Sequence, residues 1–223
     1  MSMGQQYSCP GAHGGLWRFE DSSDDILARI TNTWTNMAFG DMGRFTKYFI
    51  ANGARRATFG YTYFKPTSFT ATFWFKGTTP GADTVVISNL TVASSKNYGW
   101  YVGFDGSDDV GLGIAYGGAT IPLYAISSNG IMNDGAWHFV CATYDATDLK
   151  IYIDGVLEAT TNKGASGLAY NSYMYPAIGC FHTASVSYSY HVVGSVDDLA
   201  VYAYAWTAGE VKRWWAFCNG KLV

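Results

Sequence analysis

Residues 69–75 have the sequence FTATFWF, in which apolar side chains recur at every second position. Successive side chains of a β-strand point to opposite faces of the sheet. One face of this run therefore holds Phe69, Ala71, Phe73 and Phe75. The other face holds Thr70, Thr72 and Trp74 and is also apolar enough to be covered. The run predicts a strand that is buried on both faces.

Short alternating runs separated by turn residues continue along the chain, which is typical of an antiparallel sandwich. Residues 98–104 and 110–116 flank the loop DGSDD and predict a hairpin with a longer loop. In the second strand of this hairpin, Gly111, Gly113 and Ala115 share one face. A face of such small residues lets either another layer of side chains or a ligand approach closely.

The dipeptide Asp154-Gly155 is the strongest short hairpin motif in the chain. The strand before it, 149–154, places three aliphatic residues on a face expected to be buried. Lys150 and Tyr152 lie on its other face, which is expected to be wetter. Further strands are expected at residues 137–144, 156–160, 177–181, 186–193 and 195–204.

One helix is expected near the C-terminus. Thr207 and Glu210 have the spacing of a capping box, in which each side chain hydrogen bonds to the other residue's backbone N–H. Val211, Trp214 and Trp215 then form an apolar stripe. The pattern predicts a helix over 210–217 that lies on the sandwich. The expected fold class is all-β, a two-sheet antiparallel β-sandwich with one short C-terminal helix.

Composition and charge exclude several classes of protein. The 223 residues carry a formal net charge of −3 and no clustered basic face of the kind that nucleic acid requires. No apolar stretch approaches the ~18 residues of a membrane span, and the first fifteen residues do not resemble an export signal. We therefore expect a soluble chain with no membrane insertion. Residues 1–14 are expected to form an N-terminal arm, and residues 15–223 one domain.

The cysteines do not indicate a metal site. Cys9, Cys141, Cys180 and Cys218 are far apart, without zinc-like spacing against each other or the four histidines. Cys141 alternates in phase with Phe139, so it is expected to be a small core residue. Whether Cys9 and Cys218 pair is left open.

Five motifs occur in a fixed order along the chain, and a capped helix follows the last of them. They are GLWRFED (15–21), SFTATFWFK (68–76), NDGAWHFV (133–140), LKIYIDG (149–155) and GSVDDLAVY (194–202). In this order they resemble the laminin G-like, concanavalin A-like jelly-roll superfamily, in the branch that includes pentraxin-like modules. The resemblance covers most of residues 15–216. It implies two antiparallel sheets packed face to face and a function in binding glycans, proteins or calcium.

Catalytic members with this fold carry a strand of alternating carboxylates, and no such strand occurs here. Glycoside hydrolysis needs two carboxyl groups roughly 5 to 10 Å apart across the sugar. The chain has 14 Asp but only three Glu, namely Glu20, Glu158 and Glu210. We therefore expect no catalytic residues and no enzyme activity. The acidic loop 105–109 is expected to be a solvated hairpin, and His138 a residue of the sheet surface rather than a base.

The resemblance also implies a structural calcium ion. In relatives, an Asp at the position of Asp197 contributes to such a site together with acids of the first loop. Asp21 and Asp24 are the candidates in this loop, and calcium takes 6 to 8 oxygen ligands. The alternative is that Asp197 is a hydrogen-bonded carboxylate that ties the termini together.

The aromatic side chains are the residues most suited to carry function. Phe, Trp and Tyr make up 17% of the chain, and sugars stack on aromatic faces. The candidate ligand-binding residues are Trp100, Tyr101, Tyr170, Tyr173, Tyr175, Tyr188 and Tyr190. The alternatives are that these side chains fill the core or anchor a protein interface.

The sequence is therefore compatible with three functions. The first is a noncatalytic module exposed on a larger assembly such as a virion, as a decoration or attachment protein with glycan binding. Its partners would be other protein subunits and cell-surface glycans, and its location the virion surface or another extracellular site. The alternatives are a secreted lectin-like carbohydrate-binding protein and a diverged glycoside hydrolase.

Overall fold

The computed structural model describes most of the chain from Leu16 to Gly220. The described residues are 16–17, 32–35, 38–41, 47–52, 55–59, 65–78, 83–93, 96–118, 123–128, 130–162, 167–172, 174–183 and 187–220. The predicted N-terminal arm, residues 1–14, lies outside them. No helix among these residues is long and apolar enough to cross a membrane.

The first of two sheets has the strand order β13-β12-β11-β6-β17-β4-β3, and β1 pairs with β17. The strands are β1 (Leu16–Trp17), β3 (Phe39–Asp41), β4 (Lys47–Asn52), β6 (Phe69–Lys76), β11 (His138–Tyr144), β12 (Asp148–Ile153), β13 (Val156–Asn162) and β17 (Val193–Tyr202). The strand quoted first from the sequence, β6, thus lies in the interior of an eight-stranded sheet, between β11 and β17.

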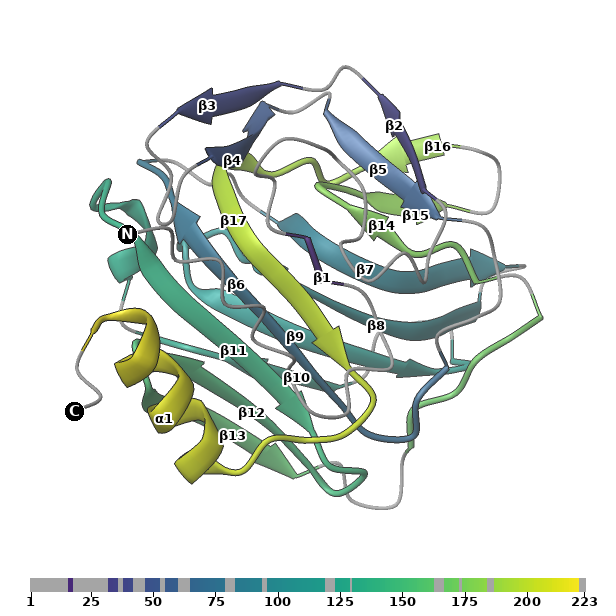
Figure 1. Cartoon of the computed structure of the whole chain (residues 1–223). Coiled ribbons are helices and arrows are strands. Elements are labelled where there is room, and N and C mark those ends of the chain that lie inside the picture. The colour runs from purple at the N-terminus through teal and green to yellow at the C-terminus, as the bar shows by residue number, and fades with distance from the viewer. Residues whose placement is uncertain are drawn as a thin grey trace.

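The second sheet has the order β10-β9-β8-β7-β14-β5-β2, and β15 pairs with β16 and β7. The strands are β2 (Asn32–Thr35), β5 (Arg56–Phe59), β7 (Thr84–Ala93), β8 (Lys96–Phe104), β9 (Val110–Tyr116), β10 (Leu123–Ile126), β14 (Ala177–Ile178), β15 (Phe181–Thr183) and β16 (Ser187–Ser189). All strand ladders among the described residues are antiparallel except the bridge between β15 and β7. The predicted two-sheet antiparallel sandwich is confirmed, and Figure 1 shows the two sheets face to face.

The main core lies between the sheets. The four alternate residues Phe69, Ala71, Phe73 and Phe75 of β6 all have 0% exposure. From the opposite sheet, the indole of Trp100 stacks on Phe69 with ring centroids 4.4 Å apart, and Phe104 meets Phe75 at 4.5 Å. Offset aromatic pairs of this kind add stability beyond the apolar area that they bury. This layer fixes which face of each strand points outward.

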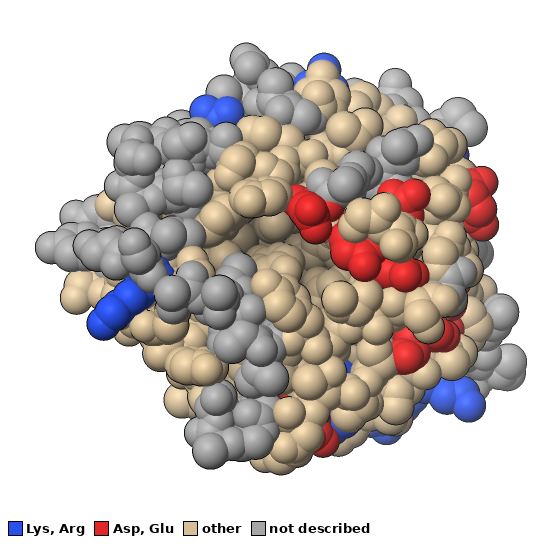
Figure 2. Space-filling view, turned by 180° about the vertical axis from the view of Figure 1, so that it is seen from behind, with Lys and Arg blue, Asp and Glu red and all other residues tan. Residues whose placement is uncertain are grey.

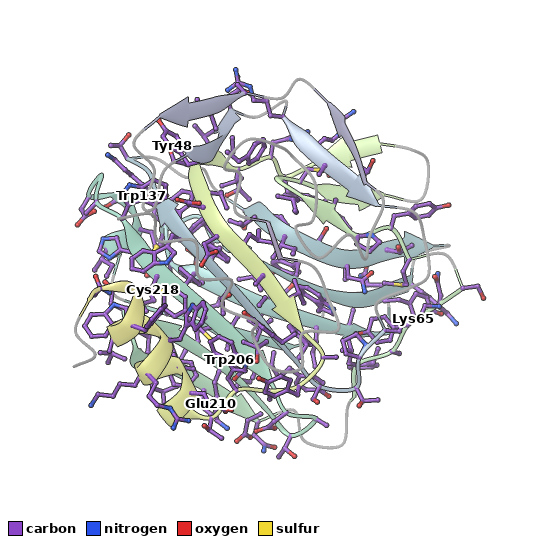
Figure 3. The ribbon with its side chains drawn as sticks, in the orientation of Figure 1. Tyr48, Lys65, Trp137, Trp206, Glu210 and Cys218 are labelled. Carbon is purple, nitrogen blue, oxygen red and sulfur yellow. The ribbon has the colours of Figure 1, made fainter. Side chains whose placement is uncertain are left out.

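The outer face of the eight-stranded sheet carries a second apolar cluster, covered by α1 (Ala208–Cys218) (Figure 1). The predicted capping box is confirmed, since Thr207 Oγ1 accepts from the Glu210 backbone N–H and the Glu210 carboxylate accepts from that of Thr207. Figure 3 shows Glu210 and Cys218 toward opposite ends of the helix. Cys141 is fully buried beneath it, which confirms the predicted core role.

Several sequence expectations require correction. Tyr152 was expected on a wetter face but is 3% exposed, because it belongs to the apolar cluster covered by α1. The expected strand 177–181 is broken into β14 and β15 at Gly179, whose φ is +79°. The expected strand 186–193 divides between β16 and the start of β17. The sequence patterns do not predict β7, β10 or the strands before residue 60, apart from the motif that contains β1.

The Asp154-Gly155 turn joins β12 to β13 as predicted. Its φ angles of +51° and +79° match the type I′ turn that suits a two-residue hairpin. The Asp154 carboxylate accepts from the Phe139 backbone N–H and lies 2.8 Å from Nδ1 of His138. Nε2 of His138 lies 3.1 Å from Asp134, in the η1–β11 connection that follows the 3-10 helix η1 (Ile131–Asn133). His138 thus links a turn and a loop.

This linkage predicts a pH-dependent contribution to stability. The hydrogen bond to Asp154, and then that to Asp134, raise the pKa of His138 above its usual value near 6.5. The stabilisation is therefore fully present below the unfolded-state pKa and is lost as pH rises through the raised pKa of the folded state. We expect His138→Gln to cost about 1 kcal/mol at pH 5.5 and less at pH 9, measured by urea denaturation. An equal cost at both pH values would contradict the ion pair.

Candidate functional site

The outer face of the nine-stranded sheet is hollowed over β7, β8, β9 and β10. The cavity has a volume of about 570 Å³, and Figure 2 shows it from outside. Ligand pockets typically measure about 300 to 1,000 Å³. The described residues around it come from these four strands, from the residues just before β7 and just after β8, from β15 and from the segment before β17. This face is opposite to the one covered by α1, so both sheets of the sandwich carry distinct outer surfaces (Figure 1).

The outward face of β9 consists of small residues because of strand alternation, and Gly111 of this face lines the pocket. Val110, Leu112 and Ile114 of β9 point into the core, so Gly111, Gly113 and Ala115 point outward. The predicted face of small residues is thus confirmed.

The two glycines on this face of β9 have different surroundings. A Cβ at Gly113 would overlap the ring of Tyr101, so glycine lets this ring lie flat against β9. A Cβ at Gly111 would meet nothing within 4 Å, which means that the space above Gly111 is open. The ring of Tyr101, which covers Gly113, and the open space above Gly111 therefore lie side by side on β9.

Two tyrosines flank Gly113 in register. Tyr101 on β8 and Tyr124 on β10 are both cross-strand partners of this glycine. Their rings meet edge to face, with centroids 6.4 Å apart and planes at 70°, and their hydroxyl groups hydrogen bond. Burial, and then the neighbouring Tyr124, raise the pKa of Tyr101 well above its usual value. Burial also raises the pKa of Tyr124. Both phenols are therefore neutral at physiological pH and present hydroxyl donors and acceptors.

Tyr190 and Phe181 form another aromatic pair at the pocket, with ring centroids 5.9 Å apart. Tyr190 is 51% exposed and has a φ of +58°. Its carbonyl accepts a hydrogen bond of 2.8 Å from the Val85 backbone N–H, which ties this left-handed residue to β7. Non-glycine residues held in this conformation cluster at functional sites. The ring of Tyr190 is thus presented to solvent on a fixed backbone.

Two carboxylates stand at one end of the pocket. Thr84 pairs with Phe104, so Asp83 and Asp105 flank the same end of the β7–β8 ladder. Asp105 Oδ1 accepts from the backbone N–H groups of Ser107 and Asp109, which shapes the hairpin loop that was predicted to be solvated. Asn97 lines the pocket from the other end of β8, so the hollow runs along this strand.

Two of the seven predicted ligand-binding residues, Tyr101 and Tyr190, line this pocket. The prediction for Trp100 is wrong, because β8 directs its indole into the core, where it is 1% exposed and stacked on Phe69. Tyr170 packs against the core and donates to the Pro66 carbonyl at 2.9 Å. Tyr175 is half-buried and is not among the lining residues.

The side chains of the remaining two candidates, Tyr173 and Tyr188, lie outside the described residues. Tyr124, Phe181 and Asp83 line the pocket but were not singled out from the sequence. For Tyr124, the alternation in the run LYAI (123–126), where Ala125 is buried and its neighbours are exposed, is the usable indication. For Asp83, no sequence pattern links it to Tyr101.

The calcium prediction stays a prediction. Asp197 is fully buried at an irregularity of β17, where its Oδ1 accepts from the Asp198 backbone N–H at 2.8 Å. Asp21 and Asp24 lie outside the described residues, as does Cys9, so its pairing with Cys218 also remains open. Within the described ranges, no three His, Cys, Asp or Glu side chains form a group that could hold a metal ion.

Comparison with known proteins agrees with this architecture. Residues 51–212 match the family model of the concanavalin A-like lectin/glucanases superfamily. The chain belongs to this superfamily. No curated protein matches the sequence closely enough to add a relative.

Solved structures with the same fold are distant in sequence. Domain 4 of AbnA, a GH43 extracellular arabinanase from Geobacillus stearothermophilus solved with arabinotriose, has a TM-score of 0.68 and 16% identity over 91% of this chain and 98% of its own. The binding domain of Botulinum Neurotoxin DC in complex with SialylT has a TM-score of 0.69 and 13% identity over 94% of this chain. The binding domain of Paraclostridial Mosquitocidal Protein 1 has a TM-score of 0.65 and 17% identity over 93% of this chain. This chain spans 52% of each of these two toxin domains, and the likeness concerns the fold.

The contrast between Trp100 and Tyr190 is testable by stability alone. We expect Trp100→Ala to lower the free energy of unfolding by about 3 to 5 kcal/mol, because it empties a core position. Tyr190→Ala, at a half-exposed position, should change it by about 0.5 kcal/mol or less. Chemical denaturation monitored by circular dichroism measures both values. Similar losses for the two variants would contradict the assignment of Trp100 to the core and of Tyr190 to the surface.

Proposed function

We propose that this chain is a noncatalytic glycan-binding module and that the pocket over β7–β10 is its binding site. The observation that carries the proposal is the combination of exposed aromatic rings with open space above Gly111. Tyr and Trp rings accept the C–H faces of sugars, and phenol hydroxyls bond to sugar hydroxyls. The neutral pair Tyr101–Tyr124 and the fixed ring of Tyr190 supply both kinds of contact.

The fold relatives support a binding role. One similar structure is a domain of an arabinanase with arabinotriose bound, and another is a toxin binding domain in complex with SialylT. The superfamily also includes glucanases by name, so the family alone does not decide between binding and hydrolysis. The choice between binding and hydrolysis therefore depends on the residues around the pocket.

A diverged glycoside hydrolase is the second candidate, because Asp83 and Asp105 flank one end of the pocket. Two features favour binding instead. Asp83 is exposed, whereas a general acid is usually held in an environment that keeps it protonated. One oxygen of Asp105 already accepts two backbone hydrogen bonds from its own loop. Release of reducing sugar from a polysaccharide panel, abolished by Asp83→Asn, would establish the hydrolase.

The proposal includes a place outside the cell, as an exposed component of a larger assembly such as a virion. Other subunits of that assembly would then be protein partners, and cell-surface glycans would be the ligands of the free pocket. A secreted lectin-like protein is the alternative setting. The pocket serves the same chemistry in either setting, because it lies on the outer face of a sheet.

The substitution Gly111→Val tests the binding site directly. Valine suits a β-strand, and its Cβ meets no neighbouring atom, so the fold should be retained. The added side chain occupies the open part of the pocket. We expect the best ligand from a glycan array to bind this variant at least about tenfold more weakly by calorimetry, which is about 1.4 kcal/mol.

Gly209→Val is the matched control. Gly209 lies in α1 on the other sheet, and its added Cβ would come no closer than 3.9 Å to another atom. This variant should bind the ligand as the unmodified chain does. Unchanged binding by Gly111→Val would place the site elsewhere.

A further inference from the structure

We infer that the pocket selects uncharged oligosaccharides and discriminates against anionic ones, an inference that rests on the proposed glycan-binding function. The feature behind it is the sign of the charges around the pocket. Asp83 and Asp105 are the ionisable lining residues other than tyrosines, and neither Lys nor Arg lines the pocket within the described part of the chain. Figure 2 shows Asp and Glu atoms gathered along one side of the hollow.

The carboxylates of Asp83 and Asp105 are held at the pocket that a ligand would occupy. Asp83 precedes β7 with a φ of +51°, and Asp105 follows β8, so the paired residues Thr84 and Phe104 bring both to the same end of the pocket. The loop hydrogen bonds of Asp105 fix its carboxylate. Asp83 is also close enough to act electrostatically on Tyr101 and Tyr124. An anionic sugar bound on these rings would therefore face like charges.

No described cation offsets this arrangement within the pocket. Lys96 neighbours the lining residue Asn97, but it stands at the opposite end of β8 from Asp105 and does not line the hollow. Nine residue steps along an extended chain separate Lys96 and Asp105 by roughly 30 Å, well beyond the Debye length of about 8 Å at physiological ionic strength. The remaining polar lining groups are phenol hydroxyls and an amide, which suit sugar hydroxyls.

Like charges placed against a ligand lower the affinity for that ligand, and a site gains specificity when only the wrong partner meets them. The pocket would thus reject uronic and sialic acids and accept neutral sugars of the same shape. Because both carboxylates stand in contact with solvent, the discrimination should decrease as salt screens it.

Calorimetric titration with matched sugars tests the inference. The probes are galactotriose with trigalacturonic acid, and the best neutral ligand from a glycan array with its sialylated form. We expect each neutral sugar that binds to do so at least tenfold more tightly than its acidic counterpart at 20 mM salt. The ratio should fall at 300 mM salt. Equal or tighter binding of the acidic forms would overturn the inference while leaving glycan binding intact.

The double variant Asp83→Asn and Asp105→Asn assigns the effect to these residues. Asn tolerates the left-handed backbone at position 83, and its carbonyl at position 105 still accepts the loop hydrogen bonds. We expect this variant to lose most of the discrimination, so that the ratio of neutral-sugar affinity to acidic-sugar affinity falls toward one. Glu158→Gln, in β13 of the other sheet, removes one negative charge that does not line the pocket, and this variant should retain the discrimination.

The outcomes distinguish failure of the charge-based selection from failure of the proposed glycan-binding function. A double variant that discriminates as strongly as the unmodified chain would overturn the charge-based selection. Loss of discrimination by Glu158→Gln as well would do the same. The absence of binding to every sugar on the array, with a folded protein, would overturn the proposed function and this inference with it.

Discussion

The alternation of side chains along β8 and β9 is the constraint on which the rest of the structure depends. The core needs Trp100, which stacks on Phe69 at 4.4 Å, and it needs Leu112 and Ile114 beside it. Once these side chains point inward, their neighbours must point outward. The outward set is Tyr101 on β8 and a row of small residues on β9. The same packing that stabilises the sandwich therefore creates an outer face with an aromatic ring beside open space.

The two outer faces of the sandwich differ in whether their outward aromatic side chains are covered. On the eight-stranded sheet, Trp74 and Tyr152 also point outward, but α1 covers them and completes a second apolar cluster. On the nine-stranded sheet, the described residues leave Tyr124 and Tyr190 exposed by 41% and 51%. Large exposed aromatic side chains around a pocket mark binding surfaces. The aromatic residues thus supply the core between the sheets, the apolar cluster beneath α1 and the surface around the pocket.

Local patterns predicted the parts of the fold that are locally determined. The strand at β6, the Asp154-Gly155 turn and the capped helix each depend on residues within a few positions of one another. The site depends on register instead. Alternation suffices to show that Trp100 and Tyr101 point opposite ways, but only the packing of β8 against the other sheet decides which of them is buried. Asp83 reaches the pocket through the pairing of Thr84 with Phe104, which no short motif encodes.

The most direct measurement of the central claim is a crystal structure of the chain with its best neutral oligosaccharide. A sugar ring in contact with Tyr101 or Tyr124, with density filling the space above Gly111, is the expected result. A sugar bound beside α1, or anywhere that leaves the pocket over β7–β10 empty, would contradict the account.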